Sequence, residues 1–120
     1  MLITGNGTGN NACHLIYQAS NNGLYLTADC GASQIGPVTP GGSGALGNSQ
    51  CSVAASSVAI TSSGNTLTVT ETTVFTSAFN GGKTTMMYTF DKSNVGSGWS
   101  NVGTWTVNAT SPRQSMLYKL

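Results

Sequence analysis

The sequence predicts an all-β protein, and three observations lead to this prediction. Glycine, serine, threonine and asparagine supply 16, 15, 17 and 11 of the 120 residues; they are poor helix formers that suit strands (Thr) and turns (Gly, Asn, Ser). No window shows the 3.6-residue period, rich in Ala, Leu, Glu and Lys, that predicts a helix. Runs of β-branched and aromatic residues recur, and residues that favour turns end them.

The first strands follow from the N-terminal third of the chain. Residues 1–4 are apolar and β-branched, so we expect a strand there, and the Gly/Asn-rich residues 5–11 are expected to form a loop. Residues 12–18 alternate in character and predict a second strand. The Asn-Asn-Gly turn at 21–23 returns the chain into residues 24–27, which predicts a hairpin.

Residues 28–50 form the longest stretch without periodicity. The segment contains Pro37, Pro40 and six glycines, and we expect it to be irregular. Loops of this length are uncommon in compact domains unless they are functional or tied down. Residues 50–53 are expected to close the loop.

A second hairpin is predicted from residues 57–61 and 66–75, which flank a Ser-Ser-Gly-Asn turn. Apolar and threonine residues alternate along the second of these strands. Glu71 and Thr73 fall on its apolar face and weaken the pattern.

The strongest strand signals lie in the last third, at residues 83–90 and 102–107, with a loop composition at 91–98. Trp105 is in the middle of a strand, and we expect it to anchor the core. Trp99 follows two glycines of the loop, so we expect it to be mostly exposed.

The chain is predicted to be one domain, residues 1–108, followed by a linker and strand-like tail at 109–120. A Pro-containing segment separates the tail from the preceding strand. Three apolar or aromatic residues fall on one face of the tail and make it a candidate donor strand: Met116, Tyr118 and Leu120.

Charge and cysteine content restrict the function. Only seven residues are acidic or basic, and the net charge is +1, which argues against a nucleic-acid partner and offers no polybasic stretch for a membrane surface. No long apolar stretch is present either, so we expect no membrane insertion. The three cysteines form no CxxC pair or His/Cys cluster, so we expect no metal and no cofactor. One disulfide with one odd thiol is the better interpretation, and it indicates an oxidising compartment and a secreted or cell-surface protein.

An ordered series of segments resembles the immunoglobulin-like β-sandwich repeat modules of large secreted and surface proteins of bacteria. The segments are Asn11-Ala-Cys-His-Leu-Ile-Tyr17, Asn22-Gly-Leu-Tyr-Leu26, Ile35-Gly-Pro-Val-Thr-Pro-Gly41, Asn48-Ser-Gln-Cys51, Ser63-Gly-Asn-Thr-Leu-Thr68, Ser97-Gly-Trp-Ser100 and Gly103-Thr-Trp-Thr-Val107. The resemblance implies an antiparallel sandwich of two sheets with about seven strands. It also implies a Cys13–Cys51 disulfide, with Cys30 unpaired. Such modules carry a further first strand, whose absence here would leave a groove for the tail to fill, from its own chain or the next.

Two functions are expected from these observations. The first is a non-catalytic structural or adhesive module that contacts other modules or copies of itself, as in a fibre assembled by strand donation. The alternative is a carbohydrate-binding module that uses Trp99, Tyr25 and the 28–50 loop. An enzyme is not expected, because the lone His14 and the two aspartates Asp29 and Asp91 fit no catalytic motif.

Overall fold

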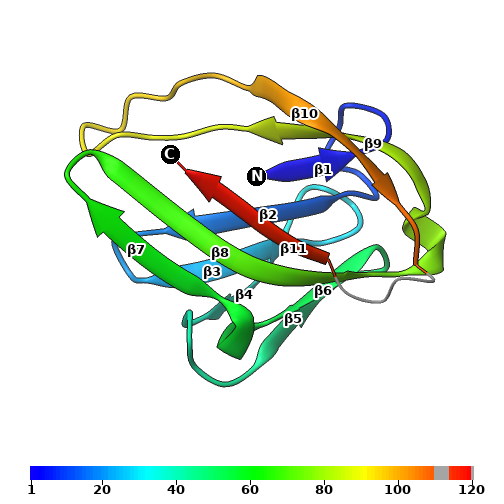
Figure 1. Ribbon diagram of the computed structural model, residues 1–120, viewed down its shortest axis with the longest axis horizontal. Helices are drawn as coiled ribbons and strands as arrows, with labels where there is room; N and C mark the ends of the chain where they lie inside the picture. Colours follow the sequence, from blue (N-terminus) through cyan, green and yellow to red (C-terminus); the bar gives the residue numbers. More distant parts are fainter. Residues whose placement is uncertain (110–113, 120) are drawn as a thin grey trace.

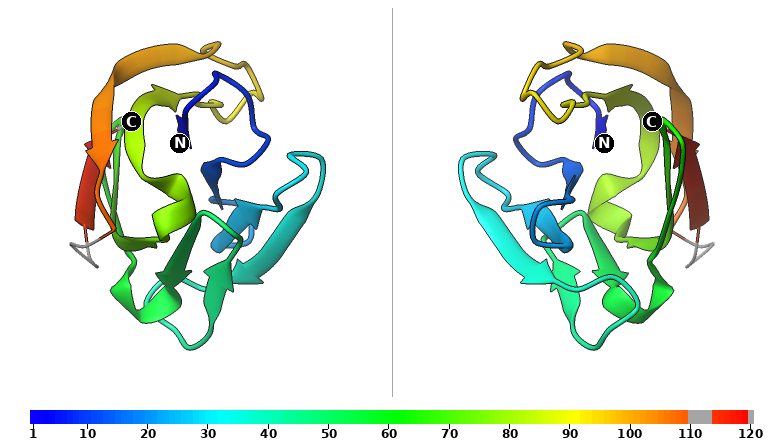
Figure 2. Two further views of the ribbon diagram at one scale, coloured as in Figure 1. Left: turned by 90° about the vertical axis from the view of Figure 1, so that its right-hand side faces the viewer. Right: turned by 90° about the vertical axis from the view of Figure 1, so that its left-hand side faces the viewer.

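The chain folds into two antiparallel sheets (Figures 1 and 2). The computed structural model describes residues 1–109 in full and the backbone of residues 114–119. The six-stranded sheet has the order β10-β9-β1-β2-β3-β4 and contains β1 (Leu2–Thr4), β2 (Cys13–Gln18), β3 (Gly23–Thr27), β4 (Gln34–Val38), β9 (Gly81–Met87) and β10 (Ser100–Val107). The five-stranded sheet has the order β11-β8-β6-β5, with β7 also paired to β8, and contains β5 (Ala45–Gly47), β6 (Cys51–Ala54), β7 (Ala59–Ser63), β8 (Thr66–Phe75) and β11 (Gln114–Lys119). Two short 3-10 helices, Ala55–Ser57 and Ser77–Phe79, connect strands of the described chain.

The predicted fold class is confirmed: the protein is an all-β sandwich of two antiparallel sheets. The number of strands is higher than the seven or so that the sequence predicts. Two of the additional strands, β4 and β5, lie in the 28–50 stretch that was expected to be irregular. Both are edge strands, where Pro37 is tolerated because an edge strand needs only half of its backbone groups paired. The high glycine and proline content of this stretch therefore marks edge strands and their turns.

The core lies between the sheets and is built by alternation along the central strands. On β8 every second residue from Val69 to Phe75 is buried, and the intervening residues are more exposed. On the opposite sheet Ile3, Leu15 and Leu26 are fully or almost fully buried. This burial of apolar surface is the main term that holds the two sheets together.

Trp105 is not the core anchor that the sequence predicts. Its side chain is half-buried and packs against the core from one side, whereas Val107, two residues further along β10, is fully buried. The reason is the position of β10, which ends the six-stranded sheet and pairs there with β9.

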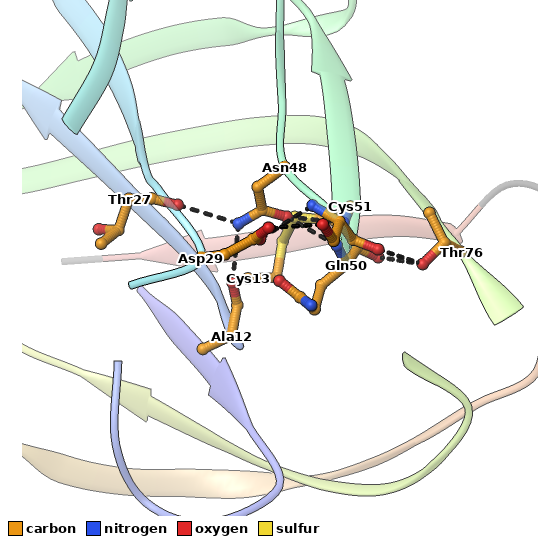
Figure 3. Close-up of a disulfide and its surroundings, with 9 residues drawn as sticks. Ala12, Cys13, Thr27, Asp29, Asn48, Gln50, Cys51 and Thr76 are labelled. Carbon is orange, nitrogen blue, oxygen red and sulfur yellow. Dashed lines mark hydrogen bonds between the residues drawn. A yellow bond between two sulfur atoms is a disulfide. The ribbon is translucent and has the colours of Figure 1, made fainter. Parts of the chain in front are cut away.

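The predicted Cys13–Cys51 disulfide is present and joins β2 to β6, and therefore one sheet to the other (Figure 3). The Cα atoms of the two cysteines are 5.8 Å apart, and both residues are fully buried. Cys30 is exposed and unpaired, as predicted.

Asn48 ties the two sheets together beside the disulfide. Its Nδ2 donates to the carbonyls of Ala12 (3.0 Å) and Thr27 (2.9 Å), and its Oδ1 accepts from the backbone N–H groups of Gln50 and Cys51 (Figure 3). One partly buried amide thus satisfies four backbone groups at a place where irregular chain would otherwise leave them unpaired.

The tail forms a strand, as the sequence predicts. β11 pairs antiparallel with β8 within the same chain over six residue pairs, from Gln114 opposite Thr73 to Lys119 opposite Thr68. Figure 1 shows β11 alongside β8, on the side away from β6 and β7. Met116 and Tyr118 occupy register positions opposite Glu71 and Val69, and Leu120 lies outside the described residues.

Candidate functional site

The largest exposed apolar side chains of the described residues all come from one segment, the connection between β9 and β10 and the start of β10. Phe90, Val95, Trp99 and Val102 are 64%, 63%, 46% and 53% exposed. Exposed aromatic and apolar side chains that gather on one surface mark a candidate site for a ligand or partner. The 46% exposure of Trp99 confirms the prediction that this side chain is mostly outside the core.

Trp99 belongs to an aromatic cluster. Its ring lies edge-on to the rings of His14 and Tyr88, with both pairs of ring centroids 5.5 Å apart, and Tyr88 in turn contacts Phe90 at 4.8 Å. Edge-on contacts between aromatic rings stabilise a particular ring orientation, in addition to the stabilisation that comes from burial of the ring surface. The cluster presents Trp99 in a defined orientation although it lies outside regular secondary structure.

The backbone turn behind the cluster follows from local sequence. Oδ1 of Asp91 accepts hydrogen bonds from the backbone N–H groups of Ser93 (2.8 Å) and Val95 (2.9 Å), and Asn94 has a left-handed φ of 62°. Gly96 leaves room for the Tyr88 ring, because a Cβ atom at position 96 would clash with that ring unless it shifted. β9 ends at Met87, earlier than predicted, because the chain turns into this hairpin.

A shallow pocket of about 240 Å³ opens beside Trp99 on the outer face of the six-stranded sheet. It is lined by Leu2, Gly7, Gly9, His14, Gly31, Met86 and Trp99. None of these side chains carries a fixed charge, so the pocket suits a neutral ligand better than a phosphate, carboxylate or ammonium group.

His14 is neutral in this pocket. Burial and, to a smaller extent, the nearby Met1 amine lower the pKa of its imidazole to about 4. One ring nitrogen, Nδ1, lies 3.1 Å from the Thr27 hydroxyl. Among the described residues no three His, Cys, Asp or Glu side chains gather where they could bind a metal ion.

Only part of the ligand site expected from sequence comes together. Of the 28–50 stretch, Gly31 alone lines the pocket, and Tyr25 does not line it. The Tyr25 hydroxyl instead accepts a hydrogen bond of 2.7 Å from Nδ2 of Asn21. His14 and Met86 were not expected at this site. The only signal for them in the sequence is the alternation of their strands, which places both residues on an outward-facing side.

A second unusual place is the interior between the sheets at the middle of β8. Glu71 and Thr73 are 1% and 0% exposed, and their side-chain oxygens make no hydrogen bond of ordinary geometry in the described part of the chain. Burial raises the pKa of Glu71 to about 7, whereas the nearby Thr73 hydroxyl and, to a smaller extent, the Met1 amine oppose this effect. The break that these two residues make in the alternation of β8 is the sequence signal for this place.

The fold contains no membrane-spanning helix among the residues that the structure describes. No protein-family model matches the chain, and comparisons with curated proteins and with solved structures find no significant match.

Proposed function

We propose that the protein is a non-catalytic extracellular structural or adhesive module whose last strand completes its sandwich and, supplied by a neighbouring copy, joins modules into a fibre. The observation that supports this proposal is the pairing of β11 with β8. β11 is the last strand of the chain, lies at the edge of its sheet, and follows a segment of six residues, 108–113, after β10 in the other sheet.

The physical argument is that backbone pairing does not depend on which chain supplies the strand. Six antiparallel residue pairs hold β11 in place, and the same ladder forms when β11 comes from another copy. Without its own β11, the β8 edge from Thr68 to Thr73 would present unpaired N–H and C=O groups with which β11 of another copy can pair. A head-to-tail contact of this kind propagates unless it closes into a ring.

The disulfide and the composition support an extracellular setting, on a bacterial surface as the resemblance implies. Disulfides persist mainly in oxidising compartments, and the Cys13–Cys51 bond is buried between the sheets. With only seven charged residues, hydroxyl and amide side chains must provide most of the polar surface.

Removing the pairing of β11 is expected to prevent self-association. We expect the full chain to form oligomers whose mass, measured by size-exclusion chromatography with light scattering, rises with protein concentration. A chain that lacks residues 112–120 should remain monomeric at the same concentrations. A second variant keeps the full length of the chain and carries Met116→Pro and Leu117→Pro. It should also remain monomeric, because proline has no backbone N–H to donate to the ladder.

Two results would contradict the proposal. One is a full chain that stays monomeric at every concentration, and the other is a deletion variant that associates as the full chain does.

The alternative function, binding of a neutral glycan, is favoured by the exposure of Trp99 beside an uncharged pocket. We expect Trp99→Ala to abolish any binding to a glycan array, whereas Tyr25→Ala, outside the pocket, should leave it intact. Equal loss in both variants, or no binding by the unaltered chain, would reject this function.

A further inference from the structure

Glu71 occupies a place where a carboxylate is difficult to ionise. Its side chain is 1% exposed, and neither of its oxygens makes a hydrogen bond of ordinary geometry in the part of the chain that the structure describes. The Thr73 hydroxyl is near enough to lower the pKa of Glu71, but burial outweighs this effect. An ionised carboxylate in such surroundings must regain water or move out.

β11 lies along one flank of β8, beside Glu71 in the ladder. On the other flank β8 is covered by β6 and β7, whereas β11 ends the sheet. In the β11–β8 ladder Met116 stands directly opposite Glu71, and Gln114 stands opposite Thr73. Detaching β11 would free this flank of β8 and remove the residues that stand opposite Glu71 and Thr73.

Few charges surround Glu71. The Met1 amine is close enough to act on it, but burial lowers the pKa of that amine to about 6. β6, β7 and the rest of β8 carry no side chain that titrates, since Cys51 is in the disulfide. On β11 the one charged residue, Lys119, is opposite Thr68, three positions from Glu71 along β8. Among the described residues the Met1 amine is the cation that acts on the pKa of Glu71, and with a pKa of about 6 it is mostly neutral at pH 7.

We propose that Glu71 is a proton-operated latch, which holds β11 on β8 while the carboxyl is neutral and releases the strand when the carboxyl ionises. The inference rests on the proposed function and adds a way to regulate it. Acidic conditions keep β11 paired within its own chain, and neutral or alkaline conditions make β11 available for exchange with another copy.

The sign and size of the effect follow from linkage. Burial holds the pKa of Glu71 at about 7 in the closed form, and release returns it toward its ordinary value of 4.5. The closed form therefore binds the proton more tightly, and a rise in pH favours release. Between pH 5.5 and 8.5 the equilibrium constant for release should increase about 30-fold.

Hydrogen exchange of the full chain tests the latch. Peptides that cover residues 66–75 and 114–119 are followed by mass spectrometry at pH 5.5 and 8.5, with rates corrected for the intrinsic pH dependence of exchange. In the unaltered chain we expect the protection of both segments to fall about 30-fold at pH 8.5. Glu71→Gln, which has the same shape and cannot ionise, should abolish the change. Asp91→Asn removes an exposed carboxylate elsewhere and should exchange as the unaltered chain does.

Three outcomes would overturn the latch. The protection could be independent of pH, it could fall equally in Glu71→Gln, or it could fall evenly over the whole chain, which would indicate global rather than local opening. The measurement is made on β11 within one chain, so it distinguishes the two proposals. If protection depends on pH as expected but no concentration-dependent oligomers form, the latch stands and strand donation is rejected. If oligomers form but protection does not depend on pH, strand donation stands and the latch is rejected.

Discussion

Reduction of the Cys13–Cys51 disulfide is expected to lower the free energy of unfolding by about 4 kcal/mol. The bond spans 38 residues of sequence, and a cross-link over a loop of that length removes about this much conformational entropy from the unfolded chain. Both sulfur atoms lie in the core between the sheets, so their replacement would also disturb packing.

Denaturant unfolding with and without reductant measures this effect. The variant Cys30→Ser is the control, because Cys30 is exposed and unpaired; it should unfold as the unaltered chain does and lose the same stability on reduction. An unfolding midpoint that reductant does not change would contradict the structural role of the bond.

Glu71→Gln is expected to raise the free energy of unfolding at pH 8 by about 3 kcal/mol. The pKa of Glu71 is about 7 in the folded protein and near 4.5 when unfolded, so the unfolded chain gives up its proton first as the pH rises. Stability from the protonated carboxyl is fully present below pH 4.5 and is lost as the pH approaches 7. Each unit of pH in that interval removes about 1.4 kcal/mol.

The difference between the two chains should thus be small at pH 4.5, grow to pH 7 and then stay constant. His14 titrates in an overlapping range, since its pKa is lowered to about 4, but it is present in both chains and its contribution cancels. Chemical unfolding of both chains at several pH values provides the comparison. A constant difference, or a Gln variant that is less stable at pH 8, would show that Glu71 is not the buried acid described here.

Much of the fold could be predicted from the sequence because strands are local. The alternation on β8 and the turns at Asn21 and Gly64 specify hairpins without knowledge of the partner strand. Strand position within a sheet is not local. The residues next to Trp105 in the sequence are those expected around a core residue. β10 is nevertheless an edge strand, and no neighbouring residue in the sequence indicates that edge position.

The candidate sites divide in the same way. The exposure of Trp99 follows from the glycines before it, whereas its contacts with His14 and Tyr88 depend on how β2 meets the β9–β10 connection. Glu71 was visible as a polar residue on an apolar face, but only the pairing with β11 shows which part of the structure its charge would disturb. Sequence thus locates unusual residues, and the topology assigns their partners.

The most direct test of strand donation is a cross-link between two full chains. Thr70 and Leu117 are directly opposite each other in the β8–β11 ladder, and opposite residues of an antiparallel pair lie at a distance that a disulfide can bridge. One chain carries Thr70→Cys and the other Leu117→Cys, both with Cys30→Ser, and they are mixed and incubated at high concentration. A mixture of Thr70→Cys with Ser115→Cys chains is the control, because Ser115 stands opposite Thr72. Strand donation predicts a disulfide-linked dimer from the first mixture alone; equal yields from the two mixtures, or no dimer from either, would contradict it.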